Sequence, residues 1–448
     1  MSKMLNFQVF LVCAAFVAGA KAQLPQVAVV ELPAQMESDA QHTIELNIEN
    51  VKKQLEDLKG KDDSIKLLVF PEYGLTGLNP DVEASAQFIP GVDVPVQQYQ
   101  NNVKRLSDIA LSYKVALVVN LLEFVNTTTT KTYYNSLIVF DENGRLIKKT
   151  HKINLRSEER EKLSAGSEIG ILEIYGNKFG LLIGEDLLTV EAFKLSAISG
   201  VIVSASWKNT LPTNLATSVA YGFERRTATP VYFSNLNKPD EGISGSGVYT
   251  SNLVDAKTTG KSSTFVKKGS MKSGRGLPGE DDNAGLRIEN ESIKNLVKTA
   301  ALSNAELYEE HHCKLTTGSD LSSAYQLVSY KSKEKIGGRD YVSYFCGLIP
   351  NDENNIRIKT NVDLANVTIE VDIDRNSDNK TIVLPVAADF NLVPPQFVYS
   401  DNNFVSVSIQ DAKDVIVFGI RILKSASFRN EFSLAVLIVC GLVKVLFG

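Results

Sequence analysis

The chain has 448 residues, of which 44% are hydrophobic and 22% charged, and a formal net charge of -5 at pH 7. This length allows one large core and a second domain, and the composition is that of a globular protein. The small negative net charge gives no sign of the basic face that nucleic-acid binding requires, so we expect no nucleic-acid partner.

The N-terminal residues have the pattern of a secretory signal peptide. Lys3 precedes a mostly apolar run over residues 5–18, and Ala20-Lys21-Ala22 is a small-x-small cleavage site. We therefore assign residues 1–22 to a signal peptide and expect the mature chain to begin near Gln23. The alternative is an uncleaved anchor, but the run is shorter than the roughly 20 residues that cross a bilayer.

The next elements predict a parallel sheet. Residues 26–32 are a nearly continuous apolar run, which is typical of a central strand. An apolar stripe from Ile44 to Leu58 at spacings of three and four predicts a helix ending at Gly60. Residues 65–70 form a second buried strand that leads into Glu72. Strand, helix and strand imply a right-handed crossover, which puts Glu72 at a carboxyl strand end where such sheets carry their chemistry.

The alternation of strands and helices continues to about residue 234 and predicts a layered α/β/β/α sandwich. A hairpin turning at Asn143-Gly144 delivers His151 and Lys152 to the region of Glu72. The expected helices are 96–113 and 214–227, and the expected strands are 115–124, 133–140, 145–149, 171–175, 178–183, 201–206 and 231–234.

The stretch from Gly176 to Thr189, GNKFGLLIGEDLLT, organises the rest of the chain. Its buried strand stops at Gly184-Glu185-Asp186, and helical periodicity begins at Leu187. A strand that turns sharply into a helix is where many hydrolases hold a nucleophile in strained geometry. Gly184 stands at this corner without a side chain, and a glycine also meets a requirement for positive φ.

The C-terminal part is predicted to be rich in β-strands. Residues 256–285 have the Lys, Gly, Ser and Thr composition of an exposed linker. Short strands are expected at 367–373, 381–386, 404–409 and 415–422. The predicted domains are 23–290 and 291–424.

Two cysteines remain once the predicted signal peptide and the C-terminal tail are set aside. Cys313 and Cys346 are expected to form a disulfide in an oxidising compartment. The alternative is a metal site at His311-His312-Cys313, but adjacent side chains rarely point at one ion. We expect no metal and no cofactor.

The C-terminal tail and four sequons indicate an exported glycoprotein. Residues 425–448 place the small residues Ser425-Ala426-Ser427 before an apolar run interrupted by Lys444, the arrangement of a GPI-attachment signal. The alternatives are a short membrane segment or a free tail. Acceptor sequons for N-linked glycans begin at Asn126, Asn290, Asn366 and Asn379. The expected location is extracellular, either anchored at the cell surface or secreted.

Several motifs resemble those of a known superfamily. Phe70-Pro71-Glu72, residues 140–146 followed by 151–155, and Gly184-Glu185-Asp186 are similar to successive signatures of the carbon-nitrogen hydrolase (nitrilase) superfamily. Residues 204–207 and 243–249 resemble its vanin and biotinidase branch. The resemblance covers residues 23–423 and implies a four-layer α/β/β/α sandwich followed by a smaller β-rich domain.

The resemblance also implies an amidase with a Glu, Lys, Cys triad. The glutamate takes the thiol proton, the thiolate attacks the amide carbonyl, and the lysine stabilises the oxyanion. Glu72 and Lys152 match the base and the lysine, but the nucleophile position falls on Gly184, and no cysteine lies between residues 23 and 312. Losing an activated nucleophile costs on the order of a millionfold in kcat. We therefore expect a non-catalytic relative that retains a site for a small amide or a protein partner, with its oligomeric state left open.

Two alternatives remain open for these residues. Glu72 and Lys152 could be ordinary solvated side chains; if both are buried, they are expected to pair. Glu185 could form a carboxylate pair with Glu72 and activate water, which would make the chain a hydrolase of pantetheine-like or biotinyl amides without a thiol.

Overall fold

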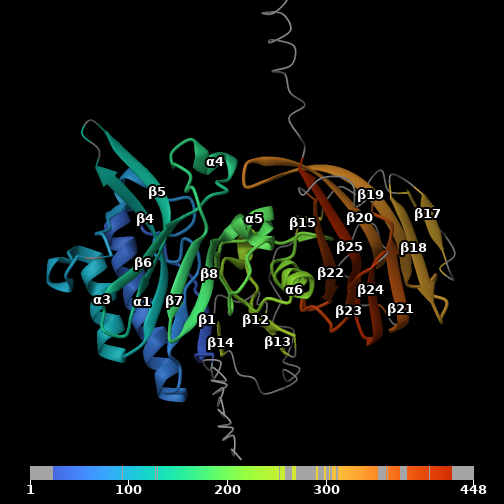
Figure 1. Cartoon of the computed structure of the whole chain (residues 1–448), viewed down its shortest axis with the longest axis horizontal. Helices are drawn as coiled ribbons and strands as arrows, with labels where there is room; N and C mark the ends of the chain where they lie inside the picture. The colour runs from blue at the N-terminus through green and yellow to red at the C-terminus, as the bar shows by residue number, and fades with distance from the viewer. Residues whose placement is uncertain are drawn as a thin grey trace, which may run out of the picture.

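A computed structural model describes residues 24–425 apart from 93, 127, 129, 252, 258–264, 269–288, 291–296, 299–301, 303–304, 309–310, 352–359, 361, 374–380 and 403. The chain folds into two parts, and helix α6 (Ala216–Thr227) lies between them (Figure 1). The predicted signal peptide lies outside the described residues, as does the predicted lipid-attachment signal except for Ser425.

The first sheet has the strand order β14-β1-β2-β4-β5-β6, with β3 paired to β4. β1 runs parallel to β2 and β2 to β4, as the strand–helix–strand pattern predicts. Its strands are β1 (Val27–Glu31), β2 (Leu67–Val69), β3 (Gln87–Phe88), β4 (Ala116–Asn126), β5 (Lys131–Phe140), β6 (Leu146–His151) and β14 (Phe265–Lys268).

Two long helices, α1 (Ala40–Lys61) and α3 (Asn101–Tyr113), cover the outer face of this sheet. α1 begins after Asp39, whose carboxylate accepts the backbone N–H of His42 at 2.6 Å, because such a cap satisfies a free donor of the first turn. The apolar stripe predicted from the sequence is the buried face of α1. Three short helices flank these layers: α2 (Val82–Ser85), η1 (Val96–Gln98) and α4 (Ser157–Arg160).

The second sheet has the order β13-β12-β11-β9-β8-β7 and stacks against the first. Val27 and Val29 face it, whereas Ala28 and Val30 face α1 and α3, so both faces of β1 are buried. Helices α5 (Val190–Phe193) and α6 cover its far side, which completes the predicted four-layer α/β/β/α sandwich. Its strands are β7 (Gly170–Ile174), β8 (Asn177–Ile183), β9 (Gly200–Ala205), β11 (Val231–Asn235), β12 (Ser246–Thr250) and β13 (Leu253–Lys257).

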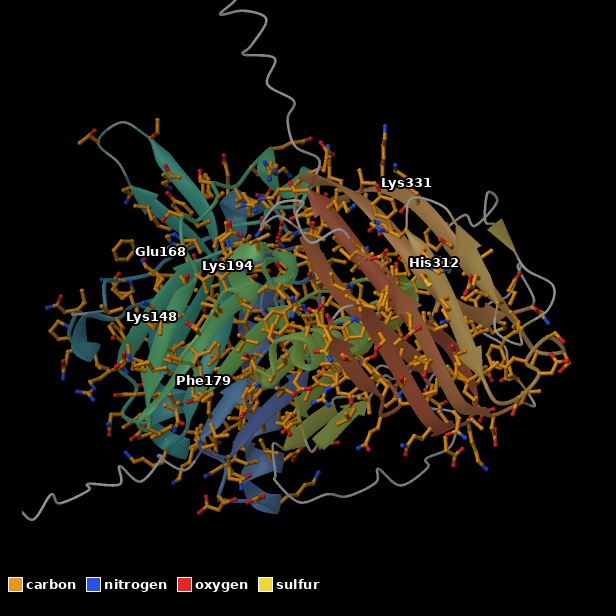
Figure 2. All side chains as sticks on the ribbon, turned by 45° about the vertical axis from the view of Figure 1, so that its right-hand side comes forward. Lys148, Glu168, Phe179, Lys194, His312 and Lys331 are labelled. Atoms are coloured by element: carbon orange, nitrogen blue, oxygen red, sulfur yellow. A yellow bond between two sulfur atoms is a disulfide. The ribbon has the colours of Figure 1, made fainter. Side chains whose placement is uncertain are left out.

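The second part is a pair of five-stranded sheets with antiparallel pairing, and the prediction that this part is rich in β-strands is confirmed. One sheet is β16 (Val297–Lys298), β19 (Tyr325–Ile336), β20 (Arg339–Pro350), β25 (Val415–Ser425) and β22 (Thr381–Asp389). The other is β17 (Glu306–Tyr308), β18 (His312–Thr317), β21 (Leu364–Val371), β24 (Val405–Ala412) and β23 (Val398–Asp401). Figure 2 shows Phe179 on the first part, with His312 and Lys331 on the second.

The two parts share one hydrophobic core through α6. Val219 and Phe223 on this helix belong to the same buried cluster as Leu384 of β22. A Cβ at Gly222 would lie 2.4 Å from the carbonyl oxygen of Pro385, so only a glycine lets α6 approach β22 this closely. The parts are therefore packed as one body rather than linked by a flexible tether.

Two local predictions differ from the structure. The segment predicted as an exposed linker contains β14, which pairs antiparallel with β1 and borders the first sheet. The helix expected from Leu187 is instead a 3₁₀ helix, η2 (Gly184–Leu188), followed by the four-residue α5.

The remaining elements are η3 (Pro239–Glu241) and the short parallel pair β10 (Thr210–Leu211) and β15 (Glu289–Asn290). Among the helices within the described residues, none combines the length and the apolar character needed to cross a membrane.

Candidate functional site

The ends of strands from both stacked sheets meet at one place. Glu72 follows β2, Lys152 follows β6, Gly184 follows β8 and Ser206 follows β9. The Ser204 hydroxyl of β9 donates to the carbonyl of Phe70 at 2.9 Å and ties the two sheets together at this edge. The structure thus brings together Glu72, Lys152 and Gly184, the residues that the motifs singled out.

Gly184 faces the two charged side chains directly. It is buried and has a φ of +50°, a conformation that glycine adopts without steric cost. A Cβ built on it would lie 3.0 Å from Oε2 of Glu72 and 3.3 Å from Nζ of Lys152. The position that faces the base and the lysine therefore carries only hydrogen.

Lys152 is fully buried; its ammonium group donates hydrogen bonds to Glu72 and Glu159 and forms an ion pair with Glu185. Its Nζ lies 2.8 Å from Oε1 of Glu72, 3.0 Å from Oε2 of Glu159 and 2.8 Å from Oε2 of Glu185. The predicted Glu72–Lys152 pairing is confirmed, but Lys152 is shared among three carboxylates. Burial by itself lowers the pKa of Lys152, and the charges of Glu185 and Glu72 outweigh it and raise the pKa above its usual value.

Glu72 is also fully buried, and both of its oxygens are occupied. Oε1 accepts from Nζ of Lys152 and from Nδ2 of Asn135, each at 2.8 Å. Oε2 accepts from Nη2 of Arg156 at 2.9 Å and from the backbone N–H and hydroxyl of Ser206 at 3.1 and 2.8 Å. Five donors therefore surround a carboxylate that offers about four lone pairs.

Sequence reasoning missed two members of the site, Arg156 and Glu159. The run RSEER at 156–160 has the composition of a solvated turn, and composition alone does not predict its burial. One signal was available, because an acidic residue three positions after a helix start often reaches back to the backbone. Glu159 does so, accepting the N–H of Arg156 at 2.7 Å while also facing Lys152.

Glu185 lies between the two cations rather than against Glu72. Its Oε1 lies 2.8 Å from Nε of Arg156, and its Oε2 lies 2.8 Å from Nζ of Lys152. Burial tends to raise the pKa of Glu185, but the charges of Arg156 and Lys152 outweigh burial and lower it to about 2. A carboxylate with so low a pKa is a weak base near neutral pH.

Asp186 fixes the loop that carries Lys152. Its carboxylate accepts hydrogen bonds from the backbone N–H of Asn154 at 2.8 Å, from Nδ2 of Asn154 at 2.9 Å and from the backbone N–H of Ile153 at 3.2 Å. Burial raises the pKa of Asp186 to about 6 in spite of these hydrogen bonds. The corner after β8 and the loop after β6 are therefore held in register by one side chain.

A cavity of about 550 Å³ opens in front of this cluster, between the two parts of the chain. Arg156, Glu185 and Ser206 line its inner end together with Trp207, and the β19–β20 hairpin tip at 334–338 lines another wall. Glu72, Lys152 and Gly184 are not among the lining residues. The cavity thus ends at Arg156 and Glu185, and these two side chains separate it from Gly184.

The structure places the other predicted residues away from the corner. Cys313 on β18 and Cys346 on β20 form a disulfide with a Cα–Cα distance of 5.7 Å, which joins the two sheets of the second part and leaves no free thiol at the proposed metal site. Asn126 and Asn366 are exposed, Asn290 lies in β15, and Asn379 lies outside the described residues.

The first part of the chain is similar to a known protein family. Residues 26–205 match the model of the carbon-nitrogen hydrolase family. Biotinidase of Mus musculus is 23% identical over 211 residues, which cover 42% of this chain and 41% of that protein. Pantetheinase of Canis lupus familiaris is 24% identical over 207 residues, which cover 41% and 40%. The matched stretch spans about two fifths of each relative.

Solved structures of the superfamily are also similar to the chain. A member of branch 10 of the nitrilase superfamily from Saccharomyces cerevisiae is 21% identical with a TM-score of 0.46, covering 54% of this chain and 89% of that one. An amidase from Nesterenkonia sp. is 18% identical with a TM-score of 0.41, covering 56% and 91%.

Proposed function

Because residues 26–205 form a carbon-nitrogen hydrolase domain related to biotinidase and pantetheinase, we propose that the chain is an exported, non-catalytic member of this group. It would act outside the cell, as a glycoprotein carried on a lipid anchor. Its role would be to bind a small amide or a protein partner rather than to hydrolyse an amide.

The corner at Gly184 is the observation that carries this proposal. A thiol route needs a sulfur that gives its proton to Glu72 and attacks the carbonyl while Lys152 stabilises the oxyanion. Gly184 faces both groups and supplies no atom that can form the covalent bond. The two cysteines of the described part are joined to each other in the second part of the chain and cannot substitute.

The alternative of a water-activating carboxylate pair loses support at the same place. It requires one of the two carboxylates to accept a proton from water near neutral pH. Glu185 is held ionised by Arg156 and Lys152, and the lone pairs of Glu72 are already occupied.

The cavity supports the binding role. Its volume of about 550 Å³ falls within the range of small-molecule pockets, roughly 300–1,000 Å³. The apolar residue Trp207 lines its inner end together with the charged side chains of Arg156 and Glu185, which are 20% and 16% exposed. Such a mixture suits a ligand with an apolar body and a polar end.

The decisive experiment is an amide-hydrolysis assay on the full chain from a secretory host. Pantetheine-type and biotinyl amides are offered to the wild type and to Glu72→Gln. We expect no turnover above that of Glu72→Gln, because the wild type already lacks the attacking atom. Turnover in the wild type that disappears in Glu72→Gln would refute the loss of activity. Calorimetric titration of the wild type with the same amides tests whether they bind without being hydrolysed.

A further inference from the structure

We propose that Arg156 and Glu185 form an internal ion pair that closes the space over Gly184. The corner is then inactive for two reasons: the thiol is missing, and the ion pair blocks access to this position. This inference rests on the proposed function, because it concerns a corner that has already lost its nucleophile. It predicts that supplying a thiol at position 184 leaves that thiol shielded.

The contacts of Arg156 show how the space is filled. Its Nη2 lies 2.9 Å from Oε2 of Glu72 and 2.6 Å from the Ser206 hydroxyl, and its Nε lies 2.8 Å from Oε1 of Glu185. The guanidinium therefore occupies the acceptor side of the carboxylate that would have to take a proton. Charge-assisted contacts of this kind are about twice as strong as neutral ones.

Glu185 has the corresponding effect on Lys152. The ammonium group of Lys152 donates hydrogen bonds to Glu72 and Glu159, and Oε2 of Glu185 lies 2.8 Å from its Nζ as an ion-pair partner. A developing oxyanion could reach Lys152 from the side of Glu185 only by displacing that carboxylate, which lies 2.8 Å from Nζ. The base and the lysine are thus both occupied by this chain's own side chains.

Burial gives the order of the layers. The side chains of Glu72 and Lys152 are 0% exposed, whereas those of Arg156 and Glu185 are 20% and 16% exposed and line the cavity. A molecule in the cavity therefore meets Arg156 and Glu185 first. To reach Gly184 it would have to part this pair.

Removing both side chains reverses each effect without changing the charge of the cluster. The pair contributes one positive and one negative charge, so the net charge of the whole cluster is the same with and without it. The side of Lys152 that faces Glu185 and one acceptor position of Glu72 become free. Removing both members also avoids the uncompensated charge that removal of one would leave.

The test measures how fast a thiol at position 184 reacts with iodoacetamide in the folded full chain. Three proteins are compared: Gly184→Cys; Gly184→Cys with Arg156→Ala and Glu185→Ala; and Gly184→Cys with Arg105→Ala and Glu49→Ala. Arg105 and Glu49 form a surface pair with the same 2.8 Å contact and serve as the matched control. In the reaction the sulfur bonds to the methylene carbon, iodide leaves, and the thiol proton passes to Glu72 or to solvent. Mass spectrometry of the peptide that contains position 184 gives the rate.

We expect the protein without Arg156 and Glu185 to react about tenfold faster or more, and the surface control to react like Gly184→Cys alone. Equal rates in all three proteins would overturn the proposal. Because the readout is alkylation, it is independent of amide turnover by the wild type, on which the proposed function depends.

A second measurement covers the case in which Gly184→Cys does not fold. A crystal structure of Arg156→Ala, Glu185→Ala, with Gly184 unchanged, should show the cavity extended to Glu72 and Lys152. Collapse of neighbouring side chains into that space would contradict the proposed role of the pair.

Discussion

Strand β6 and the residue that follows it supply side-chain nitrogens to two clusters that are built in opposite ways. Lys149 and His151 reach Glu123, whereas Lys152, the next residue, reaches Glu72, because successive side chains of a strand point to opposite faces. We call Glu123, Ser136, Lys149 and His151 the outer cluster, and Glu72, Lys152, Arg156, Glu159 and Glu185 the inner cluster.

The outer cluster has one carboxylate and several donors. Glu123 is buried, while the side chains of Lys149 and His151 are 23% and 27% exposed, and the Ser136 hydroxyl adds a bond at 2.7 Å. Burial tends to raise the pKa of Glu123, but the bonds from His151 and Lys149 outweigh burial and lower it. The loss of one donor leaves the others in place.

The inner cluster has the reverse arrangement, three carboxylates around one fully buried ammonium. It therefore depends on single residues, and a substitution there should cost far more than in the outer cluster. That difference can be measured.

The largest expected effect comes from Lys152→Met. It leaves Glu72, Glu159 and Glu185 with Arg156 as the one cation of the cluster, and an uncompensated buried charge costs about 3–5 kcal/mol. Lys149→Met should cost only about 1–2 kcal/mol, because Glu123 keeps His151 and Ser136. Urea unfolding followed by the fluorescence of Trp207, the chain's single tryptophan, gives both values.

Lys104→Met, at an exposed helix pair, is the control for removing a lysine. Similar losses for Lys152→Met and Lys149→Met would show that the two clusters are equally tolerant.

The second effect is a loss of folding stability at low pH that comes from the inner cluster. The folded-state pKa of Glu185 is lowered from its ordinary value of 4.5 to about 2, so the folded state binds fewer protons than the unfolded state between these values. The stability that Glu185 contributes is present above pH 4.5 and is lost as the pH falls through 2. It amounts to at most on the order of 3 kcal/mol.

Glu185→Gln should remove this part of the acid-induced loss. Unfolding free energies of the two proteins between pH 5 and 2 should converge as the pH falls. Asp186 acts in the opposite direction, because its raised pKa of about 6 favours the folded state as the pH falls from 6 toward 4. Both proteins contain Asp186, so its contribution cancels in the comparison. Parallel curves would mean that Glu185 titrates normally.

The difference between the clusters also marks what the sequence could predict. Glu72, Lys152 and Gly184 were identified because their flanking motifs resemble those of the nitrilase superfamily, and periodicity placed each of them at the end of a strand. Arg156 and Glu159 were missed because burial of a charged turn depends on what packs over it. Here the cover is the β19–β20 hairpin, whose Gly337 carbonyl accepts Nη2 of Arg160 at 2.9 Å.

The fold shows the same division. The four layers follow from apolar runs and helical stripes that are local in the chain. Strand β14 was predicted as linker because its pairing with β1 joins residues more than 200 positions apart, and no local composition encodes it. The helix after Gly184 is shorter than its periodicity suggests, because Asp186 is drawn back to Ile153 and Asn154.

The smallest effect tests whether the inner cluster leaves room at its corner. Gly184→Ala adds one methyl group at a φ of +50° and 3.0 Å from Oε2 of Glu72, so we expect a loss of about 1–2 kcal/mol from backbone strain alone. Gly60→Ala is the matched control, because a Cβ there meets nothing within 4 Å and the site is helical, so it should gain about 0.4–1 kcal/mol. A Gly184→Ala protein as stable as the wild type would mean that the backbone at this corner relaxes and that the carboxylate of Glu72 moves aside. The inner cluster would then be adaptable like the outer one, and a thiol at this corner would lack only access.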